Sequence, residues 1–244
     1  GGIVVGYQEN EMYVASDISA LIPHTQTIAY LEGGELLLAT PSGAQYTNLS
    51  GDIISKRPII VTEGSVTVGK GKYDHFMLKE IYEQPESVIS TMGGRVLFDK
   101  STVEFNEFFL SDQEISNISK VVLLGMGTSL HAAMVGRHWI ESLARIPSEY
   151  DNSSEFRYRD PIVDENTLVV SVCQSGETAD TLAAMTKAAS LGARQITLSN
   201  YEGTQATRIA ESTILIRAGT EIGVAASKTF TSSLVSLYVM AIHL

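Results

Sequence analysis

The sequence Ser171-Val172-Cys173-Gln174-Ser175-Gly176-Glu177-Thr178 decides how the rest of the chain is interpreted. It follows a β-type run at 167–170 and precedes a segment, 179–191, of helical character. The first backbone N–H groups of a helix have no partner within it, and the helix dipole makes this end positive. We therefore predict an anion-binding turn in which Gln174, Ser175 and Thr178 donate hydrogen bonds without help from lysine or arginine. An ordinary strand–turn–helix with a capping hydroxyl is the alternative, and this stretch alone leaves both open.

Strands and helices alternate from residue 120 onward. Short runs predict strands at 120–124, 148–151, 167–172, 194–198 and 213–216. Helical segments are predicted at 130–143, 178–191, 204–211 and 227–244. This alternation is typical of an α/β fold with a parallel sheet, right-handed crossovers and helices on both faces. Ligands of such sheets bind beyond the carboxyl ends of the strands.

A second hydroxyl-rich turn, Gly127-Thr128-Ser129, follows the strand predicted at 120–124. It and the turn at 174–178 both come at the carboxyl end of a strand, so we expect them at the same edge of the sheet. Two such turns at one edge favour an anion site over two unrelated helix caps.

The first 70 residues have a different, β-rich pattern. We expect hairpins that pair 3–7 with 12–15 and 28–31 with 35–39, and a capped helical turn at 16–22. The pattern predicts the domains 1–70, 71–115 and 116–244, the middle one being a linker with a helix. That helix should break at Pro85, and Ser111 to Glu114 resembles a capping box. Residues 96–110 are interpreted as an acidic connection with little periodicity.

The composition of the 244 residues excludes some functions: 44% are hydrophobic and 18% charged, which is typical of a soluble globular protein. The net charge of -11 disfavours a nucleic-acid backbone or an anionic membrane as a partner. A single cysteine cannot form an intrachain disulfide and fits a reducing compartment. With no visible signal peptide and no apolar run long enough to span a bilayer, we expect a cytoplasmic protein. We expect neither a metal nor a cofactor, and His24 is interpreted as a loop residue.

Four segments together resemble one family, the glutamine–fructose-6-phosphate aminotransferases (glucosamine-6-phosphate synthases), in the first of its two sugar-isomerase (SIS) domains. They are 127–129, 154–158, 174–182 and 219–225. The segment 79–85 is similar to the family's helix that leads into that domain. The segments 15–17 and 31–35 resemble the closing part of its glutaminase domain, which has an N-terminal nucleophile. The resemblance runs along essentially the whole chain, in the family's order.

The resemblance implies that the chain binds fructose 6-phosphate and glucosamine 6-phosphate. The matching positions that hold the phosphate are Thr128, Ser129, Gln174, Ser175 and Thr178, and Val224 matches a position whose backbone contacts the sugar. Gly127, Cys173, Gly176 and Ala226 complete the predicted set of binding residues.

The chain departs from the family at Cys173 and Ala226, because the family commonly has serine at the first position and often at the second. Each change removes a hydroxyl donor from the predicted site. We interpret Cys173 as a small residue that lines the turn, not as a nucleophile, since no histidine lies near it in sequence. Glu177 is expected to cap the helix that follows it, Glu221 to support its loop, and Lys228 to be structural or solvated.

The resemblance also implies catalytic residues that this sequence does not contain. Residue 1 is not the cysteine nucleophile of the glutaminase, and the isomerase glutamate, the Schiff-base lysine and a histidine from a neighbouring subunit all match beyond Leu244. Since both ends lack the usual start and stop signals, we expect a piece of a longer protein. This piece would be inactive alone, and it would join a second SIS domain and form a homodimer.

Two other functions are compared with this hypothesis. A phosphosugar-sensing SIS module that regulates a partner would need an effector segment, and 1–70 contains no basic recognition helix. A standalone SIS isomerase would need a complete acid and base set within the chain, which the sequence does not contain.

Overall fold

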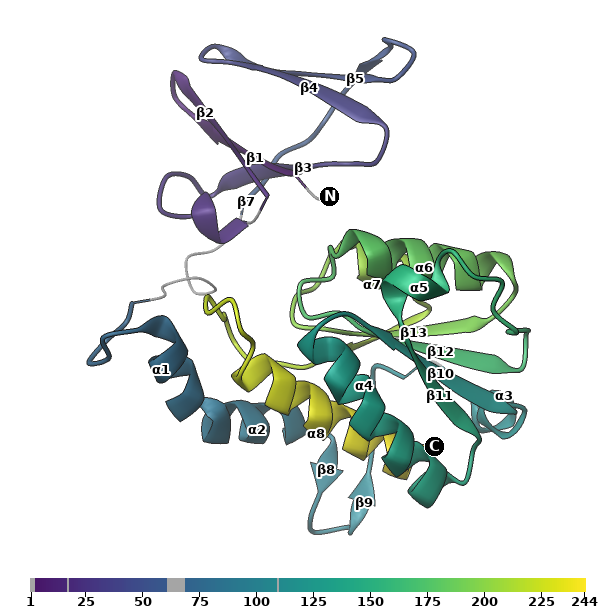
Figure 1. The fold of residues 1–244 in the computed structure, drawn as a ribbon. Helices are drawn as coiled ribbons and strands as arrows, with labels where there is room; N and C mark the ends of the chain where they lie inside the picture. Colours follow the sequence, from purple (N-terminus) through teal and green to yellow (C-terminus); the bar gives the residue numbers. More distant parts are fainter. Residues whose placement is uncertain (1–2, 17, 61–68, 109) are drawn as a thin grey trace. The chain divides into compact units, whose positions relative to one another are not determined.

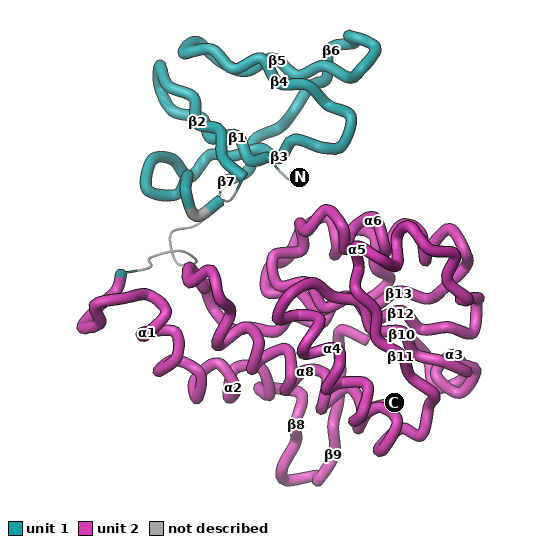
Figure 2. Tube along the Cα trace, viewed as in Figure 1, with its two compact units in different colours: residues 1–69 teal, residues 70–244 magenta. Residues whose placement is uncertain are grey.

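The computed structural model describes residues 3–16, 18–60, 69–108 and 110–244. Expectations that rest on Gly1, Gly2 or Asp17 lie outside these residues. The chain divides into two compact units, residues 1–69 and 70–244, which are coloured separately in Figure 2. Each unit is described by itself below.

The first unit is built from short strands. The elements in order are β1 (Ile3–Gln8), β2 (Glu11–Ala15), the 3-10 turn η1 (Ile18–Ala20), β3 (Thr27–Leu31), β4 (Glu35–Thr40), β5 (Gly43–Asn48), β6 (Ile53–Ile54) and β7 (Ile59–Ile60). One sheet has the order β2-β1-β3-β7 and another the order β4-β5-β6. β1 and β2 form the expected antiparallel hairpin, with Val4 opposite Ala15. The predicted helical turn is present as η1.

The second predicted hairpin is wrong, because β3 and β4 do not pair. β3 lies between β1 and β7, so both of its edges already have partners. The chain does turn after β3, where the Glu35 amide donates to the Glu32 carbonyl at 3.2 Å. β4 then pairs with β5 across the next turn, with Thr40 opposite Gly43. A glycine-containing turn between two β-type runs therefore did not indicate which strands pair.

The second unit has a five-stranded parallel sheet at its centre. In order across the sheet the strands are β11 (Ser148–Asn152), β10 (Lys120–Gly125), β12 (Thr167–Val172), β13 (Arg194–Ser199) and β14 (Ser212–Leu215). The chain thus leaves β10 in one direction to form β11 and returns on the other side of β10 to form β12. The crevice beyond β10 and β12, where the direction reverses, is the usual ligand position in sheets of this order.

Helices cover both faces of this sheet, which confirms the predicted α/β fold (Figure 1). One face carries α4 (Thr128–Trp139), its π-helical extension Ile140–Ala144 and α8 (Lys228–His243), and the other carries α5 (Ser153–Phe156), α6 (Ala179–Ser190) and α7 (Gln205–Ile209). Side chains alternate between the two cores, since Val121 packs on the α4–α8 side and Val122 on the α6 side. This alternation is what a strand buried on both faces requires.

The helix that leads into this unit breaks as predicted. α1 (Phe76–Tyr82) ends at Glu83, and α2 (Gln84–Met92) begins with Pro85 in its first turn. Its buried side is polar, however: Thr91 donates to the Ile216 carbonyl at 2.6 Å, and Ser87 donates to the Ala218 carbonyl at 3.2 Å. The pair α1–α2 therefore docks by hydrogen bonds to the segment that follows β14.

The described residues between 93 and 116 contain more secondary structure and are more deeply packed than the sequence indicates. They form β8 (Val96–Leu97), β9 (Thr102–Val103) and α3 (Asp112–Ser116). Phe105 and Phe108 are buried in the α4–α8 core, although the sequence of 96–110 indicates only an acidic connection with little periodicity. The capping box is present, and hydrogen bonds from the Ser111 amide and hydroxyl, with one from Arg194, lower the pKa of Glu114 to about 2. Within the described residues no helix is long and apolar enough to cross a membrane.

Candidate functional site

A cavity of about 190 Å³ lies at the carboxyl ends of β10 and β12, between the two hydroxyl-rich turns. The structure brings most of the predicted binding residues together in its lining: Thr128, Ser129, Cys173, Gln174, Ser175, Thr178, Val224 and Ala226. The N-termini of α4 and α6 both begin at this cavity, because each helix follows one of the two strands. The residues predicted from two distant parts of the sequence thus form one site.

The two predicted glycines shape the turns and do not line the cavity. Gly127 has φ +54° and Gly176 has φ +68°, a backbone region that other residues rarely adopt. At Gly176 a Cβ would also lie 2.1 Å from Thr204 Oγ1, so the turn is packed closely against the start of α7. The Gly176 amide donates to the Cys173 carbonyl at 3.1 Å and its carbonyl accepts from the Ala206 amide at 3.0 Å. Its role is therefore to let the turn close.

The amide groups at the site are not all free. The Ser129 amide donates to the Met126 carbonyl at 3.0 Å, so Ser129 offers its hydroxyl and not its backbone. Among the described residues no backbone carbonyl accepts from the Ser175 amide. The Ser175 Oγ accepts a hydrogen bond from the Glu177 amide at 3.2 Å. The Ser175 hydroxyl proton therefore remains able to donate to a ligand. On the α6 side, Ser175 therefore offers both a backbone amide and a hydroxyl, whereas Ser129 on the α4 side offers only its hydroxyl.

The predicted role of Glu177 is wrong, because it caps a different helix from the one expected. Its carboxylate accepts from the Gln205 amide at 3.0 Å and from the Gln205 side chain at 2.6 Å, which places it at the start of α7. The approach of α7 to Gly176 brings that helix start within reach. Glu177 therefore ties the turn at 174–178 to α7.

The interpretations of Glu221 and Lys228 are confirmed. Glu221 lines the cavity and accepts from the Ser227 amide at 2.8 Å and from the Thr229 hydroxyl, so its oxygens hold the loop to the start of α8. Lys228 is only 4% exposed and its Nζ lies 2.7 Å from Glu83 Oε2. The ammonium group of Lys228 is therefore a structural partner of α1–α2.

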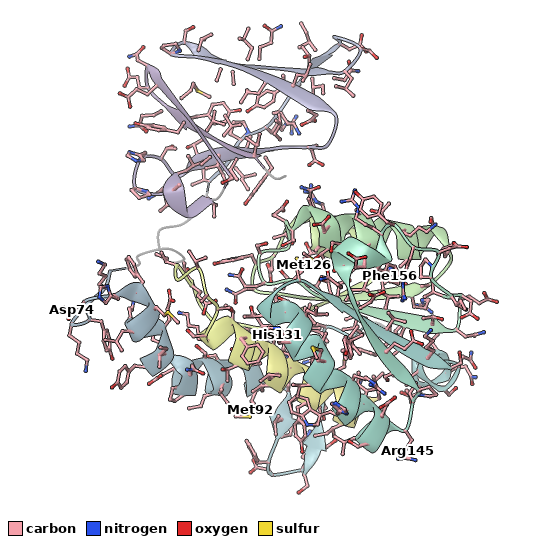
Figure 3. All side chains as sticks on the ribbon, in the orientation of Figure 1. Asp74, Met92, Met126, His131, Arg145 and Phe156 are labelled. Carbon is pink, nitrogen blue, oxygen red and sulfur yellow. The ribbon has the colours of Figure 1, made fainter. Side chains whose placement is uncertain are left out.

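Sequence reasoning missed several lining residues. They are Met126, Val172, Thr181, Gly223, Thr229, Phe230 and Ser233. Met126 is labelled in Figure 3, between β10 and α4. Thr229 and Ser233 are four residues apart on α8, so a hydroxyl pair on one helix face was a signal that could have found them.

No lysine, arginine or histidine is among the residues that line this cavity in the described part of the chain. Attraction for an anion would therefore have to come from the helix starts and from the hydroxyl and amide donors. The described residues also contain no group of three or more His, Cys, Asp or Glu side chains placed to hold a metal ion. A second, more open depression of about 560 Å³ lies in the first unit and is lined by 7–9 and 22–27. The strands beside it, β1 and β3, are antiparallel, so it does not lie at the carboxyl ends of parallel strands.

Cys173 is expected to react slowly with alkylating reagents. Burial raises the pKa of its thiol above 9.0, and the nearby donors of Thr178 and Gly176 offset only part of this effect. At pH 7.5 the native chain should lose its thiol to iodoacetamide at least about tenfold more slowly than the urea-unfolded chain. Mass spectrometry over time measures both rates. Equal rates would show that the thiol is neither buried nor kept protonated.

Comparison with known proteins gives the following similarities. The SIS domain family matches residues 114–243. The glutamine–fructose-6-phosphate aminotransferase of Clostridium acetobutylicum is 40% identical over 240 residues, which is 98% of this chain and 39% of that protein. The enzyme of the same name from Symbiobacterium thermophilum is 43% identical over 242 residues, covering 99% of this chain and 40% of that protein. This chain therefore spans about two fifths of these relatives.

A solved structure is also similar. It is the C-terminal domain of glucosamine-fructose-6-phosphate aminotransferase from Francisella tularensis, with a TM-score of 0.65 and 35% identity, covering 71% of this chain and 48% of that one. The family match, the relatives and the parallel sheet confirm the resemblance that the motifs at 127–129 and 174–182 indicated. The chain belongs to the SIS domain family.

Proposed function

We propose that this chain holds the phosphate group of fructose 6-phosphate or glucosamine 6-phosphate in the cavity beyond β10 and β12. It would do so as part of a glutamine–fructose-6-phosphate aminotransferase. The proposal is carried by one observation: residues from the turns at 127–129 and 174–178 line the same cavity, at the point where the strand order reverses. The names of the relatives support the choice of sugar phosphate.

The phosphate would lie against the turn at the start of α6. Ser175 offers a hydroxyl and an amide there, and the first turn of α6 adds its dipole. Ser129 lines the same cavity from the start of α4. The sugar would then extend toward Val224, which lines the cavity from the loop before α8 and whose side chain is fully exposed.

Binding, and not proton transfer, is the part of the reaction that we assign to this chain. Glu221 is the carboxylate in the cavity lining, and its oxygens are occupied by groups at the start of α8. A general base needs an oxygen that reaches the substrate proton. We propose that the base comes from a second SIS domain, that the Schiff-base lysine lies near the C-terminus of the complete protein, and that this protein is a cytoplasmic homodimer.

Isothermal titration tests the proposal directly. The chain should bind glucosamine 6-phosphate with a Kd of about 1 mM or tighter. Ser175→Ala should raise that Kd about tenfold, because it removes a hydrogen bond to a charged group. Ser190→Ala is the matched control, since Ser190 is exposed at the far end of α6, where its hydroxyl donates to the Lys187 carbonyl at 2.7 Å.

Two results would contradict this proposal. One is that titration with glucosamine 6-phosphate to 10 mM, a concentration about ten times the expected Kd, gives no heat of binding. The other is an equal Kd for the wild type and Ser175→Ala, which would place the ligand elsewhere.

A further inference from the structure

A buried carboxylate from outside the sheet holds the part of the cavity wall that Gly223 and Val224 form. Glu80 lies on α1 and is 1% exposed. Its Oε1 accepts from the Ile222 amide at 2.6 Å and from the Gly223 amide at 3.1 Å, across more than 140 residues of sequence. A buried carboxylate needs such donors, so this contact is a specific one and not a loose approach of helix and loop.

The loop is fitted to this carboxylate. A Cβ at Gly223 would lie 2.5 Å from Glu80 Oε2, so the absence of a side chain lets the loop approach the helix. Gly223 and the next residue, Val224, both line the cavity. The position of the cavity wall is therefore set by a residue that does not itself line the cavity.

Other contacts fix the end of the same loop. Glu221 accepts from the Ser227 amide at 2.8 Å, and Lys228 pairs with Glu83 on the helix side at 2.7 Å. These contacts hold the junction with α8, whereas Glu80 holds the middle of the loop. Loss of Glu80 would leave the middle of the wall without its contact to α1.

Glu80 also changes the electrostatics of the wall. Two successive backbone N–H groups would be a weak anion site if they pointed into the cavity. Here both are used by Glu80, and the lining residue Glu221 adds a second negative charge nearby. An anion in the cavity is thereby disfavoured at this wall and favoured at the α6 turn.

We propose that Glu80 is a positioning residue for sugar-phosphate binding. It holds residues 222–224 so that the Val224 backbone meets the sugar, and it directs the phosphate away from these residues, to the α6 turn. This inference rests on the proposed function, because it assumes that the cavity binds a sugar phosphate. It adds a residue from the helix before the sheet, at a position that neither turn motif contains.

The test uses Glu80→Gln in the full chain. Glutamine has the same shape and can still accept a hydrogen bond, but its NH₂ group would face an amide hydrogen and the charge is lost. The matched control is Glu86→Gln, which removes the same charge from the exposed side of α2. Glucosamine 6-phosphate probes the whole cavity and inorganic phosphate probes the α6 turn alone. Hydrogen exchange at 222–224 reports on the loop itself.

We expect Glu80→Gln to raise the Kd of glucosamine 6-phosphate about tenfold, whereas the Kd of inorganic phosphate changes less than about twofold. Exchange at 222–224 should become faster in Glu80→Gln, and Glu86→Gln should resemble the wild type in every measurement. A purely structural role would weaken both ligands together. An equal loss for both ligands, or unchanged glucosamine 6-phosphate binding, would overturn the inference.

The experiment also separates this inference from the proposed function. If the wild-type chain binds neither ligand, the proposed function fails. Hydrogen exchange then decides on Glu80 by itself: an unchanged rate at 222–224 in Glu80→Gln would show that Glu80 does not hold the loop. If exchange at 222–224 is faster in Glu80→Gln but not in Glu86→Gln, this would support the inference that Glu80 holds the loop in place.

Discussion

Gly176→Ala should lower the free energy of unfolding of the 70–244 unit by about 3 kcal/mol and abolish sugar-phosphate binding. Two costs add at this position. The backbone has φ +68°, which an alanine adopts only with strain, and the new Cβ would lie 2.5 Å from Thr204 Cβ and 2.1 Å from Thr204 Oγ1. Relief of the overlap must move the turn or α7, and the turn carries Ser175. Urea unfolding followed by circular dichroism measures the loss.

Gly203→Ala is the control that separates the two costs. Gly203 has φ +73°, and a Cβ there would meet nothing within 4 Å. It should therefore show only the backbone cost, about 1 kcal/mol, and retain ligand binding. Equal destabilisation by the two variants would mean that the close approach of the turn to α7 contributes nothing.

Arg95→Met should destabilise the same unit by about 3 kcal/mol, because it removes a buried charge that several groups depend on. Arg95 is 1% exposed, and its guanidinium donates to Glu107 Oε1 at 2.7 Å, to the Leu215 carbonyl at 2.7 Å and to the Thr91 carbonyl at 3.0 Å. Methionine keeps much of the volume but leaves these acceptors without a donor. The midpoint of urea unfolding at pH 7 reports the change.

Arg217→Met is the matched control, since Arg217 bonds the same Glu107 oxygen at 2.8 Å from a more exposed position. It should cost about 1 kcal/mol or less. A cost as large as that of Arg95→Met would show that the charge on Glu107, and not the buried geometry, sets the effect.

The pH dependence of the wild type follows from the same pair. Burial raises the pKa of Glu107, but the hydrogen bond from Arg95 and the charges of Arg95 and Arg217 together lower it by more than burial raises it. The pKa of Glu107 in the folded chain is therefore below 4.5. A lowered pKa means that the stabilisation is full above about pH 4.5 and is lost as the pH falls through the folded value. Arg95→Met should make this acid loss smaller.

The sequence predicted the parts of the fold that depend on local pattern. Runs such as 120–124 and 167–172 are buried on both faces, so their composition alone identified them as central strands. The break at Pro85 and the capping box at Ser111 have causes within a few residues. The two turns at the cavity were found in the same way, because hydroxyl and glycine residues after a strand have a local meaning.

The errors have a common cause, which is that the partner lies far away in sequence. Nothing near Glu177 shows that it caps α7 and not α6, and nothing near Thr91 shows that its hydroxyl meets the Ile216 carbonyl. Hydrophobicity alone does not identify the buried side of the helices before the sheet, because Ile89 is 66% exposed and Glu80 is buried. The role of Glu80 in the cavity wall depends on a contact across more than 140 residues and could only be found in the structure.

β11 is one of the two edge strands of the parallel sheet, and its charged residues affect whether copies of the protein aggregate. β11 is Ser148–Asn152, and its Glu149 and Asp151 form ion pairs with Lys120 at 3.1 Å and with Arg159 at 2.6 Å. A terminal strand is a template on which a second chain can add β-structure and start aggregates. The charged pairs on β11 oppose the addition of another strand, because that strand would have to remove water from the charged groups.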